Sequence, residues 1–113
     1  MFISWKGGLN CTPQEINKIP QLAGIYVITD YNGKIYYVGQ ANNLQRRFAE
    51  HLSDSEPNIN LKKFINQYYA KFFWIEVPSK ENRDSIELSI YSKEAPALNN
   101  IRPSGTIPIP VSW

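Results

Sequence analysis

One glutamate, Glu87, falls among apolar side chains when residues 80–94 are drawn as a helix. At about 100° per residue, Glu87 lies between Ile90 and Tyr91 on the helix surface. Glutamates normally occupy the polar face of a helix. A carboxylate on an apolar face must be paired, protonated or bound to a cation, because burying an unpaired charge carries a large desolvation penalty.

Two kinds of partner would satisfy this carboxylate. One is a salt bridge, for which Arg47 and Arg83 are the candidates. The other is a divalent cation, Mg²⁺ or Mn²⁺, since magnesium is often held by one or two carboxylates, waters and a substrate phosphate. The only cysteine, Cys11, excludes an intramolecular disulfide and a cysteine-based metal cluster. Because HExxH, glycine-loop and serine–histidine–acid motifs are also missing from the sequence, Glu87 is the best candidate for a metal ligand.

A basic pair, Arg47 and His51, lies on the helix expected at residues 43–54, which Asn42 or Asn43 would cap. The two side chains are one turn apart, at the edge of the apolar stripe. An arginine stem that covers the core and a satisfied core-edge histidine are the plain interpretations of this pair.

Two tyrosines, Tyr26 and Tyr37, stand in β-prone runs on either side of Asn32-Gly33. Asn-Gly between such runs is a strong signal for a β-hairpin. A two-residue turn would place Gly39 opposite Tyr26, whereas a four-residue loop would pair the two tyrosines directly.

Either turn puts the two phenols on one face of the hairpin, since opposed residues share a face. Tyr36 and Val38 then share the other face. Because Gly39 has no side chain, the space above the Tyr26 phenol should remain open. An aromatic strand pair that packs on a core is the plain interpretation of these residues.

The remaining elements must position these side chains. Residues 1–23 are expected to be irregular apart from a short helix after Thr12 that ends before Pro20. A second helix at 59–69 carries Leu61, Phe64, Ile65 and Tyr68 at helical spacing, a central strand spans 71–77, and a third helix spans 80–94. The order ββ-α-α-β-α predicts an α+β fold, a small three-stranded antiparallel sheet flanked by helices.

Composition limits the class of protein. With 113 residues, 42% hydrophobic and 13% aromatic, the chain is expected to form one globular domain over residues 1–113, ending in a Pro-rich extended tail at 101–113. A net charge of +2 and a pI of about 8.7 permit nucleic-acid binding without requiring it. No apolar run approaches the ~20 residues of a membrane span, and no signal peptide is evident. We expect a cytoplasmic protein with no membrane partner.

In their order and spacing, the motifs resemble the catalytic domain of the GIY-YIG nucleases. This superfamily includes homing endonucleases of group I introns, several type II restriction enzymes, and the repair subunit that incises 3′ to a DNA lesion. The resemblance covers about residues 22–100. It rests on Gly24-Ile25-Tyr26, Tyr37-Val38-Gly39-Gln40-Ala41, Asn43-Leu44-Gln45-Arg46-Arg47, His51, Glu87 and Pro96-Ala97-Leu98-Asn99.

The resemblance implies the GIY-YIG endonuclease fold and a DNA endonuclease that hydrolyses phosphodiester bonds with one divalent ion. Tyr26 takes the position of the tyrosine that acts as general base on the attacking water, and Tyr37 stands beside it in the same site. Arg47 matches the arginine that holds the scissile phosphate.

Three further positions match the family. Glu87 takes the place of the single metal-binding carboxylate. Asn99 matches an asparagine that supports the site, and its spacing from Glu87 favours it over Asn100. His51 matches a histidine of the homing and restriction branches that the repair branch often lacks.

The implied site has a consistent chemistry. A free phenol has a pKa near 10, which is too high for an efficient base at neutral pH. A nearby Arg47, a protonated His51 and a divalent cation would all favour the phenolate.

Departures from the family leave other functions open. Val38 replaces the isoleucine of the family name, which is a minor change. No separate DNA-binding domain is visible, so targeting would come from a second copy, a partner protein, or a preference for a DNA structure. A catalytically weak nucleic-acid-binding module or accessory subunit is therefore the alternative hypothesis. RNA is a smaller possibility, since Trp74, Tyr68 and Tyr69 could stack on bases, although core packing explains them more simply.

Overall fold

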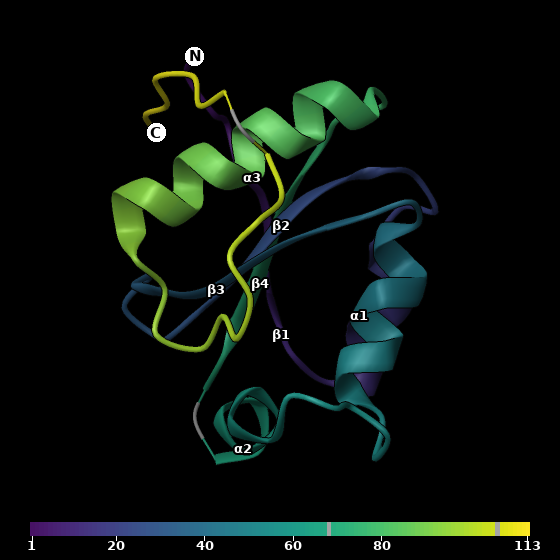
Figure 1. Cartoon of the computed structure of the whole chain (residues 1–113). Helices are drawn as coiled ribbons and strands as arrows, with labels where there is room; N and C mark the ends of the chain where they lie inside the picture. Colours follow the sequence, from purple (N-terminus) through teal and green to yellow (C-terminus); the bar gives the residue numbers. More distant parts are fainter. Residues whose placement is uncertain (68, 106) are drawn as a thin grey trace.

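A sheet of four antiparallel strands separates two layers of helices in the computed structural model, which describes residues 1–67, 69–105 and 107–113 (Figure 1). The strands are β1 (Lys6–Asn10), β2 (Gly24–Thr29), β3 (Ile35–Ala41) and β4 (Lys71–Glu76). The helices are α1 (Leu44–Leu52), α2 (Ile59–Gln67) and α3 (Lys80–Glu94), together with η1, a short 3₁₀ helix (Pro13–Lys18).

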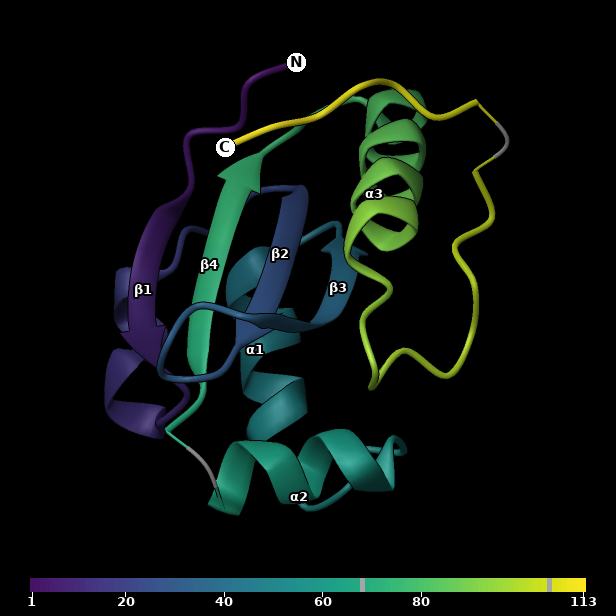
Figure 2. The ribbon, with the colours of Figure 1, turned by 90° about the vertical axis from the view of Figure 1, so that its left-hand side faces the viewer.

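The strands lie in the order β1-β4-β2-β3, which Figure 2 shows from the side. The expectation of three strands was wrong, because β1 falls in the segment expected to be irregular. Gly7 and Gly8 have positive φ angles of 99° and 73°, and the register shifts between Gly7 and Leu9. This segment has no β-prone run of its own, so its strand depends on pairing with the edge of β4.

The hairpin has the predicted register around the first tyrosine. Tyr26 pairs with Gly39, and Ile28 pairs with Tyr37. The turn is longer than two residues, because the Asp30 carboxylate accepts hydrogen bonds from the backbone N–H groups of Asn32 and Lys34, both at 2.9 Å.

A β-bulge accompanies this longer turn, and it places Tyr36 differently from the sequence prediction. Thr29 pairs with Ile35, which leaves Tyr36 as the extra residue of β3. Its ring packs 4.7 Å from the ring of Phe64, on the same side of the sheet as Tyr37. The expectation that Tyr36 shares a face with Val38 was therefore wrong.

Helix limits follow the predicted signals closely. Asn43 caps α1, with its side chain accepting a hydrogen bond from the Arg46 N–H at 3.0 Å. α3 spans the predicted residues and ends at Ala95, which adopts a left-handed conformation. Thr12 precedes η1 without a side-chain capping bond. The predicted position of Tyr68 on α2 lies outside the described residues.

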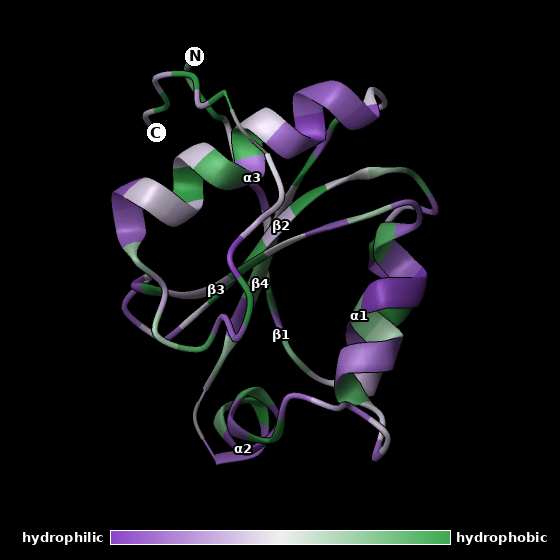
Figure 3. Cartoon of the chain, in the orientation of Figure 1, coloured by the Kyte–Doolittle hydropathy of each residue, from purple (hydrophilic) through white to green (hydrophobic). Residues whose placement is uncertain are grey.

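Each face of the sheet carries its own core, and β2 is buried along its whole length. Figure 3 shows hydrophobic and hydrophilic residues alternating along the helices, as amphipathic layers require. The core under α1, α2 and η1 includes Tyr26, Leu44, Phe48, Leu61, Phe64 and Phe72, and the core under α3 includes Ile25, Val27, Val38, Ile75, Ile86 and Ile90.

The residues after α3 run along β3 and then back past α3 to the N-terminus (Figure 2). The N–H of Leu98 donates to the Tyr36 carbonyl at 2.9 Å, and the N–H of Ile109 donates to the Ser89 hydroxyl at 2.7 Å. A bridge between Phe2 and Ser112 joins the two ends. Over the described residues, no helix has the length and apolar character that a membrane crossing requires.

Candidate active site

A pocket of about 480 Å³ opens where β3, α1, α3 and the residues after α3 meet. Four of the six predicted site residues line it: Tyr37, Arg47, Glu87 and Asn99. The structure therefore brings together, from distant parts of the chain, a phenol, a guanidinium, a carboxylate and an amide.

The other two predicted residues, Tyr26 and His51, lie outside the pocket lining and are sealed below it. Tyr26 is 1% exposed and His51 is 2% exposed. The expected open space above Tyr26 is filled by its own phenol, since a Cβ at Gly39 would overlap the Tyr26 hydroxyl. Tyr37 is thus the tyrosine in contact with the pocket, and Tyr26 lies behind it, with the two rings stacked at 6.1 Å.

Below the pocket, Tyr26 and His51 form a short hydrogen bond. The Tyr26 hydroxyl lies 2.6 Å from Nε2 of His51. Nδ1 of the same ring lies 2.8 Å from Oε2 of Glu56, and both side chains are almost fully buried. By hydrogen-bond geometry, neither Nδ1 nor Oε2 has a partner among the described residues, so their 2.8 Å contact is a close approach of ion-pair type.

The environment sets the protonation of these groups. Burial raises the pKa of Tyr26 well above its usual value, and Tyr37 adds to that effect while Arg47 opposes it. Burial likewise lowers the pKa of His51, against the opposing pull of Glu56. These shifts favour a neutral imidazole at His51 and a neutral phenol at Tyr26, which runs against the protonated His51 considered from the sequence.

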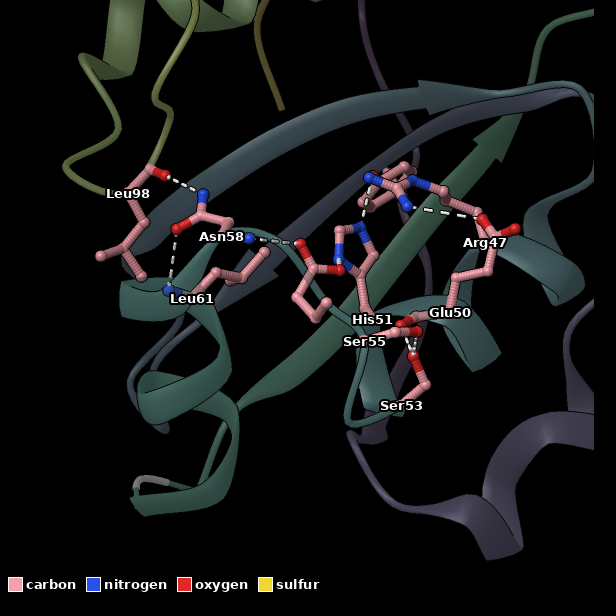
Figure 4. Close-up of polar contacts among 10 residues, drawn as sticks. Arg47, Glu50, His51, Ser53, Ser55, Asn58, Leu61 and Leu98 are labelled. Carbon is pink, nitrogen blue, oxygen red and sulfur yellow. Dashed lines mark hydrogen bonds and ion pairs between the residues drawn. The ribbon is translucent and has the colours of Figure 1, made fainter.

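Arg47 carries the positive charge of the pocket. Burial favours its neutral form, but Tyr26, Tyr37 and Glu56 together raise its pKa above the usual value. Its Nη1 atom makes a half-exposed ion pair with Oε1 of Glu50 at 3.4 Å, the contact drawn in Figure 4. Such an exposed pair holds the guanidinium only weakly, so Arg47 remains free to bind an anion.

Glu87 is half-buried, and it has no salt bridge among the described residues. Oε1 accepts a hydrogen bond from Nε2 of Gln40 at 3.0 Å. The alternative partner Arg83 instead donates to the carbonyls of Val77 and Pro78, at 2.9 and 2.8 Å. Burial raises the pKa of Glu87. Among the described residues, the carboxylate thus has a hydrogen bond but no ion pair, which leaves it able to bind a cation.

This donor set fits a single hard divalent cation. Glu87 offers an oxygen ligand that faces the pocket, and magnesium is commonly held by one or two carboxylates plus waters and phosphate. Among the described residues there is no group of three or more His, Cys, Asp or Glu side chains that could enclose a metal. Asp84, which also accepts from Gln40 at 2.8 Å, is already paired with Lys80.

Asn99 is held by the backbone of β3. Its Nδ2 donates to the Val38 carbonyl at 2.8 Å, and its Oδ1 accepts from the Val38 N–H at 3.0 Å. The side chain therefore supports the strand that carries Tyr37, with both polar ends of its amide already bonded.

Three polar residues around the site had no role in the sequence prediction: Gln40, Glu56 and Asn58. Gln40 directly follows the second tyrosine motif, so its place in the strand was a usable signal. Glu56 and Asn58 lie in the turn between α1 and α2, beyond the reach of helical spacing. Asn58 ties that turn down, because its Nδ2 donates to the Leu98 carbonyl at 2.8 Å (Figure 4).

Sequence comparison decides the family. A family model of the GIY-YIG catalytic domain matches residues 22–101. This chain belongs to the GIY-YIG family. The GIY-YIG chain is 38% identical over 55 residues to UvrABC system protein C of Dictyoglomus thermophilum, across 47% of the chain and 9% of that protein. It is 29% identical over 92 residues to UvrABC system protein C of Lactobacillus delbrueckii subsp. bulgaricus, across 81% of the chain and 15% of that protein. The chain thus spans only a small part of these relatives.

Solved structures show the same GIY-YIG fold. The N-terminal endonuclease domain of UvrC from Thermotoga maritima, bound to magnesium as its catalytic divalent cation, superposes with a TM-score of 0.63 at 22% identity, over 76% of this chain and 92% of that one. A variant of that domain with asparagine replaced by alanine gives a TM-score of 0.64 at 19% identity, over 78% and 93% of the two chains. At these identities, the likeness is one of fold.

Proposed function

We propose that this GIY-YIG domain is a divalent-metal-dependent DNA endonuclease that hydrolyses phosphodiester bonds. The observation that carries the proposal is the meeting of Tyr37, Arg47 and Glu87 in one pocket. Phosphodiester hydrolysis needs an activated water, neutralisation of charge on the phosphoryl oxygens and help for the leaving oxygen. These three side chains supply a proton acceptor, a fixed positive charge and a cation ligand.

We assign the contact with the attacking water to Tyr37 and not to Tyr26. A general base must lie within hydrogen-bonding reach of the proton that it removes. Tyr37 lines the pocket, whereas Tyr26 is 1% exposed and is already bonded to His51. Tyr26 therefore acts behind Tyr37.

Arg47 binds the scissile phosphate in this proposal. A guanidinium offers several donors in a fixed plane that suits phosphate oxygens. Its raised pKa keeps it charged at every relevant pH. Arg47 thereby stabilises the negative charge that develops as the phosphorus is attacked.

Glu87 would hold the divalent ion, Mg²⁺ or Mn²⁺, with Gln40 fixing the carboxylate. When bound, such an ion supplies Lewis-acid stabilisation of phosphoryl and leaving oxygens. Asn99 keeps the Tyr37 strand in place through Val38. Because UvrC of Thermotoga maritima binds magnesium as a catalytic cation on the same fold, the same chemistry at Glu87 is the natural proposal.

Partners follow from this reaction. The substrate is DNA, and a targeting protein or a second copy of the chain would select the site of cleavage. The net charge of +2 gives only weak non-specific attraction to a phosphate backbone.

The direct test is cleavage of supercoiled plasmid, and of duplex, flap, branched and single-stranded DNA and RNA, with and without Mg²⁺ or Mn²⁺. We expect metal-dependent nicking by the wild type and none by Glu87→Gln, whereas Glu76→Gln, which alters an exposed ion pair with Lys6, should cleave normally. Equal nicking by wild type and Glu87→Gln would refute the proposal. Salt-dependent binding to DNA without turnover under any metal would favour the accessory binding module instead.

A further inference from the structure

Glu56, which lines the pocket, continues into a line of polar contacts through His51 to Tyr26 beneath it. The Glu56 Oε2–His51 Nδ1 distance is 2.8 Å, and the His51 Nε2–Tyr26 hydroxyl distance is 2.6 Å. All three side chains are at least nine-tenths buried, so water does not satisfy them. Such a line has the arrangement of a carboxylate that orients a histidine, which in turn accepts a proton from a hydroxyl.

The carboxylate at one end determines the tautomer of the ring. Burial acts to raise the pKa of Glu56, but the close contact with His51, the hydrogen bond from the Asn58 N–H and the Arg47 charge together lower it. An ionised carboxylate accepts hydrogen bonds only, so its 2.8 Å contact with Nδ1 favours the neutral tautomer that carries its hydrogen on Nδ1. Nε2 is then the acceptor and the Tyr26 hydroxyl is the donor.

Glu56 is held by Asn58, which is itself bonded to two other parts of the chain. Its Oε1 accepts from the Asn58 N–H at 3.2 Å. The Asn58 side chain accepts from the Leu61 N–H at 3.1 Å and donates to the Leu98 carbonyl at 2.8 Å. The turn between α1 and α2 is thereby joined both to α2 and to the segment that carries Asn99, which gives the carboxylate a rigid support.

We propose that Glu56 is a positioning residue that holds His51 with its hydrogen on Nδ1, so that Nε2 can take the proton of Tyr26 during water activation at Tyr37. This inference rests on the proposed nuclease function. It adds a residue that the sequence motifs did not contain, and it gives a role to a buried histidine that does not line the pocket.

The proton transfers balance without a phenolate in the resting site. The attacking water gives a proton to the Tyr37 oxygen and bonds to phosphorus through its own oxygen. In this proposal Tyr37 gives its phenolic proton to Tyr26, the phenol stacked behind it with ring centroids 6.1 Å apart, and Tyr26 gives its proton to Nε2 of His51. One proton leaves the water and one proton arrives at the imidazole, where the Glu56 carboxylate faces the new charge.

The charged and titratable groups around the His51 imidazole all influence its pKa. Arg47 and Glu50 lie on α1 with His51, Glu56 follows α1, and Tyr26 and Tyr37 approach from β2 and β3. Arg47 disfavours the imidazolium, whereas Glu56 and Glu50 favour it. Glu56 is the only one of these carboxylates that contacts the ring, at 2.8 Å.

The first test needs no variant and no activity. His51 is the only histidine of the chain, so its ring nitrogens give unambiguous signals in ¹⁵N-edited NMR of the whole protein. We expect a neutral ring with the hydrogen on Nδ1 at pH 7. A ring that carries its hydrogen on Nε2 would overturn the proposal.

The second test compares Glu56→Gln with Glu76→Gln, which removes one carboxylate from an exposed ion pair with Lys6. Loss of the Glu56 charge should lower the pKa of His51 in the NMR titration. It should also reduce the plateau rate of DNA cleavage by roughly tenfold or more and move the acidic limb of the pH–rate profile to lower pH. Glu76→Gln should change none of the three.

The outcomes separate this inference from the proposed function. A Glu56→Gln variant with unchanged cleavage rate and unchanged His51 titration would overturn the positioning role while the nuclease stands. If the wild type cuts no substrate, the nuclease proposal fails, and the tautomer and titration still show whether Glu56 orients His51. A purely structural Glu56 would lower the unfolding midpoint without moving the acidic limb.

Discussion

The side-chain amide of Asn99 bonds both polar backbone groups of Val38, at 2.8 and 3.0 Å, in the manner of a neighbouring strand. β3 is the last strand of the sheet on that side, so its free edge would otherwise be open at Val38. Because Val38 lies between Tyr37 and Gly39, the amide of Asn99 fixes the backbone of the YVG motif itself.

Asn99→Ala should therefore destabilise the fold. Loss of two hydrogen bonds, with the Val38 groups left partly unsatisfied, should lower the free energy of unfolding by about 1–3 kcal/mol. Urea unfolding of the wild type and the variant measures this difference. Asn100→Ala, a change at the exposed neighbouring residue, is the control, and an equal loss in both variants would contradict this role of Asn99.

Glu87→Gln should abolish stabilisation by divalent metal. A ligand that binds the folded state alone stabilises it by RT ln(1 + [L]/Kd), so Mn²⁺ or Mg²⁺ should raise the Tm of the wild type and not that of the variant. The variant without metal should be at least as stable as the wild type, because burial disfavours the ionised carboxylate. A metal-induced rise in Tm that survives the substitution would place the cation elsewhere.

His51 should make stability depend on pH. The folded state lowers the pKa of His51 below its ordinary 6.5, so the unfolded chain binds a proton first as pH falls. Stability is then lost on going down from about pH 6.5, by at most about 1.4 kcal/mol per pH unit.

Unfolding measured from pH 7.5 to 5 in the wild type and in His51→Gln isolates this contribution. Glu87 acts with the opposite sign in the acidic part of the range, because its raised pKa makes the folded state take up a proton before the unfolded state does. It does so in both proteins, so the difference between the two curves belongs to His51. A constant difference across the range would show that the folded state leaves the pKa of His51 unchanged.

Gly39→Ala should strain the hairpin. An added Cβ would overlap the Tyr26 hydroxyl and lie 2.9 Å from its Cε1 atom, and Tyr26 is packed against Phe72 and His51. Overpacking of this kind commonly costs about 1–3 kcal/mol.

A double-mutant cycle with Tyr26→Leu tests the cause. If the ring of Tyr26 is the obstacle, the loss caused by Gly39→Ala should be smaller in the Tyr26→Leu background, with a coupling energy that exceeds the error of the unfolding measurement. Additive losses would show that the backbone of β3, and not the phenol, resists the extra methyl group.

Local signals explain why much of the fold was predictable. Asn43 and Ser79 are helix caps with side chains that bond the first turn, and prolines punctuate the chain after η1 and β4, so these helix limits could be read directly. The pairing of Tyr26 with Gly39 followed from strand alternation about the turn. The structure could therefore be predicted where a capping residue, a proline or strand alternation determines the local conformation.

Features that depend on tertiary contacts could not be placed in this way. β1 contains two glycines with positive φ and becomes a strand only against β4. The bulge at Tyr36 accompanies the Asp30 turn and packing on Phe64. The alternation of side chains along a strand predicts neither of these contacts. Glu56 lies five residues after His51, in a turn with no periodicity, so only the folded chain shows that the two side chains meet.

The pocket draws its walls from both layers of the fold, with Arg47 and Glu56 from the side of α1 and α2 and Glu87 from α3. Tyr37 also lines the pocket, and Asn99, which follows α3 in the chain, closes the edge of β3. Chains are synthesised from the N-terminus, and domains generally fold as units. A nascent chain that has not yet reached residue 99 thus has no assembled pocket, so under the proposed function it could cut no nucleic acid until residue 99 has been added.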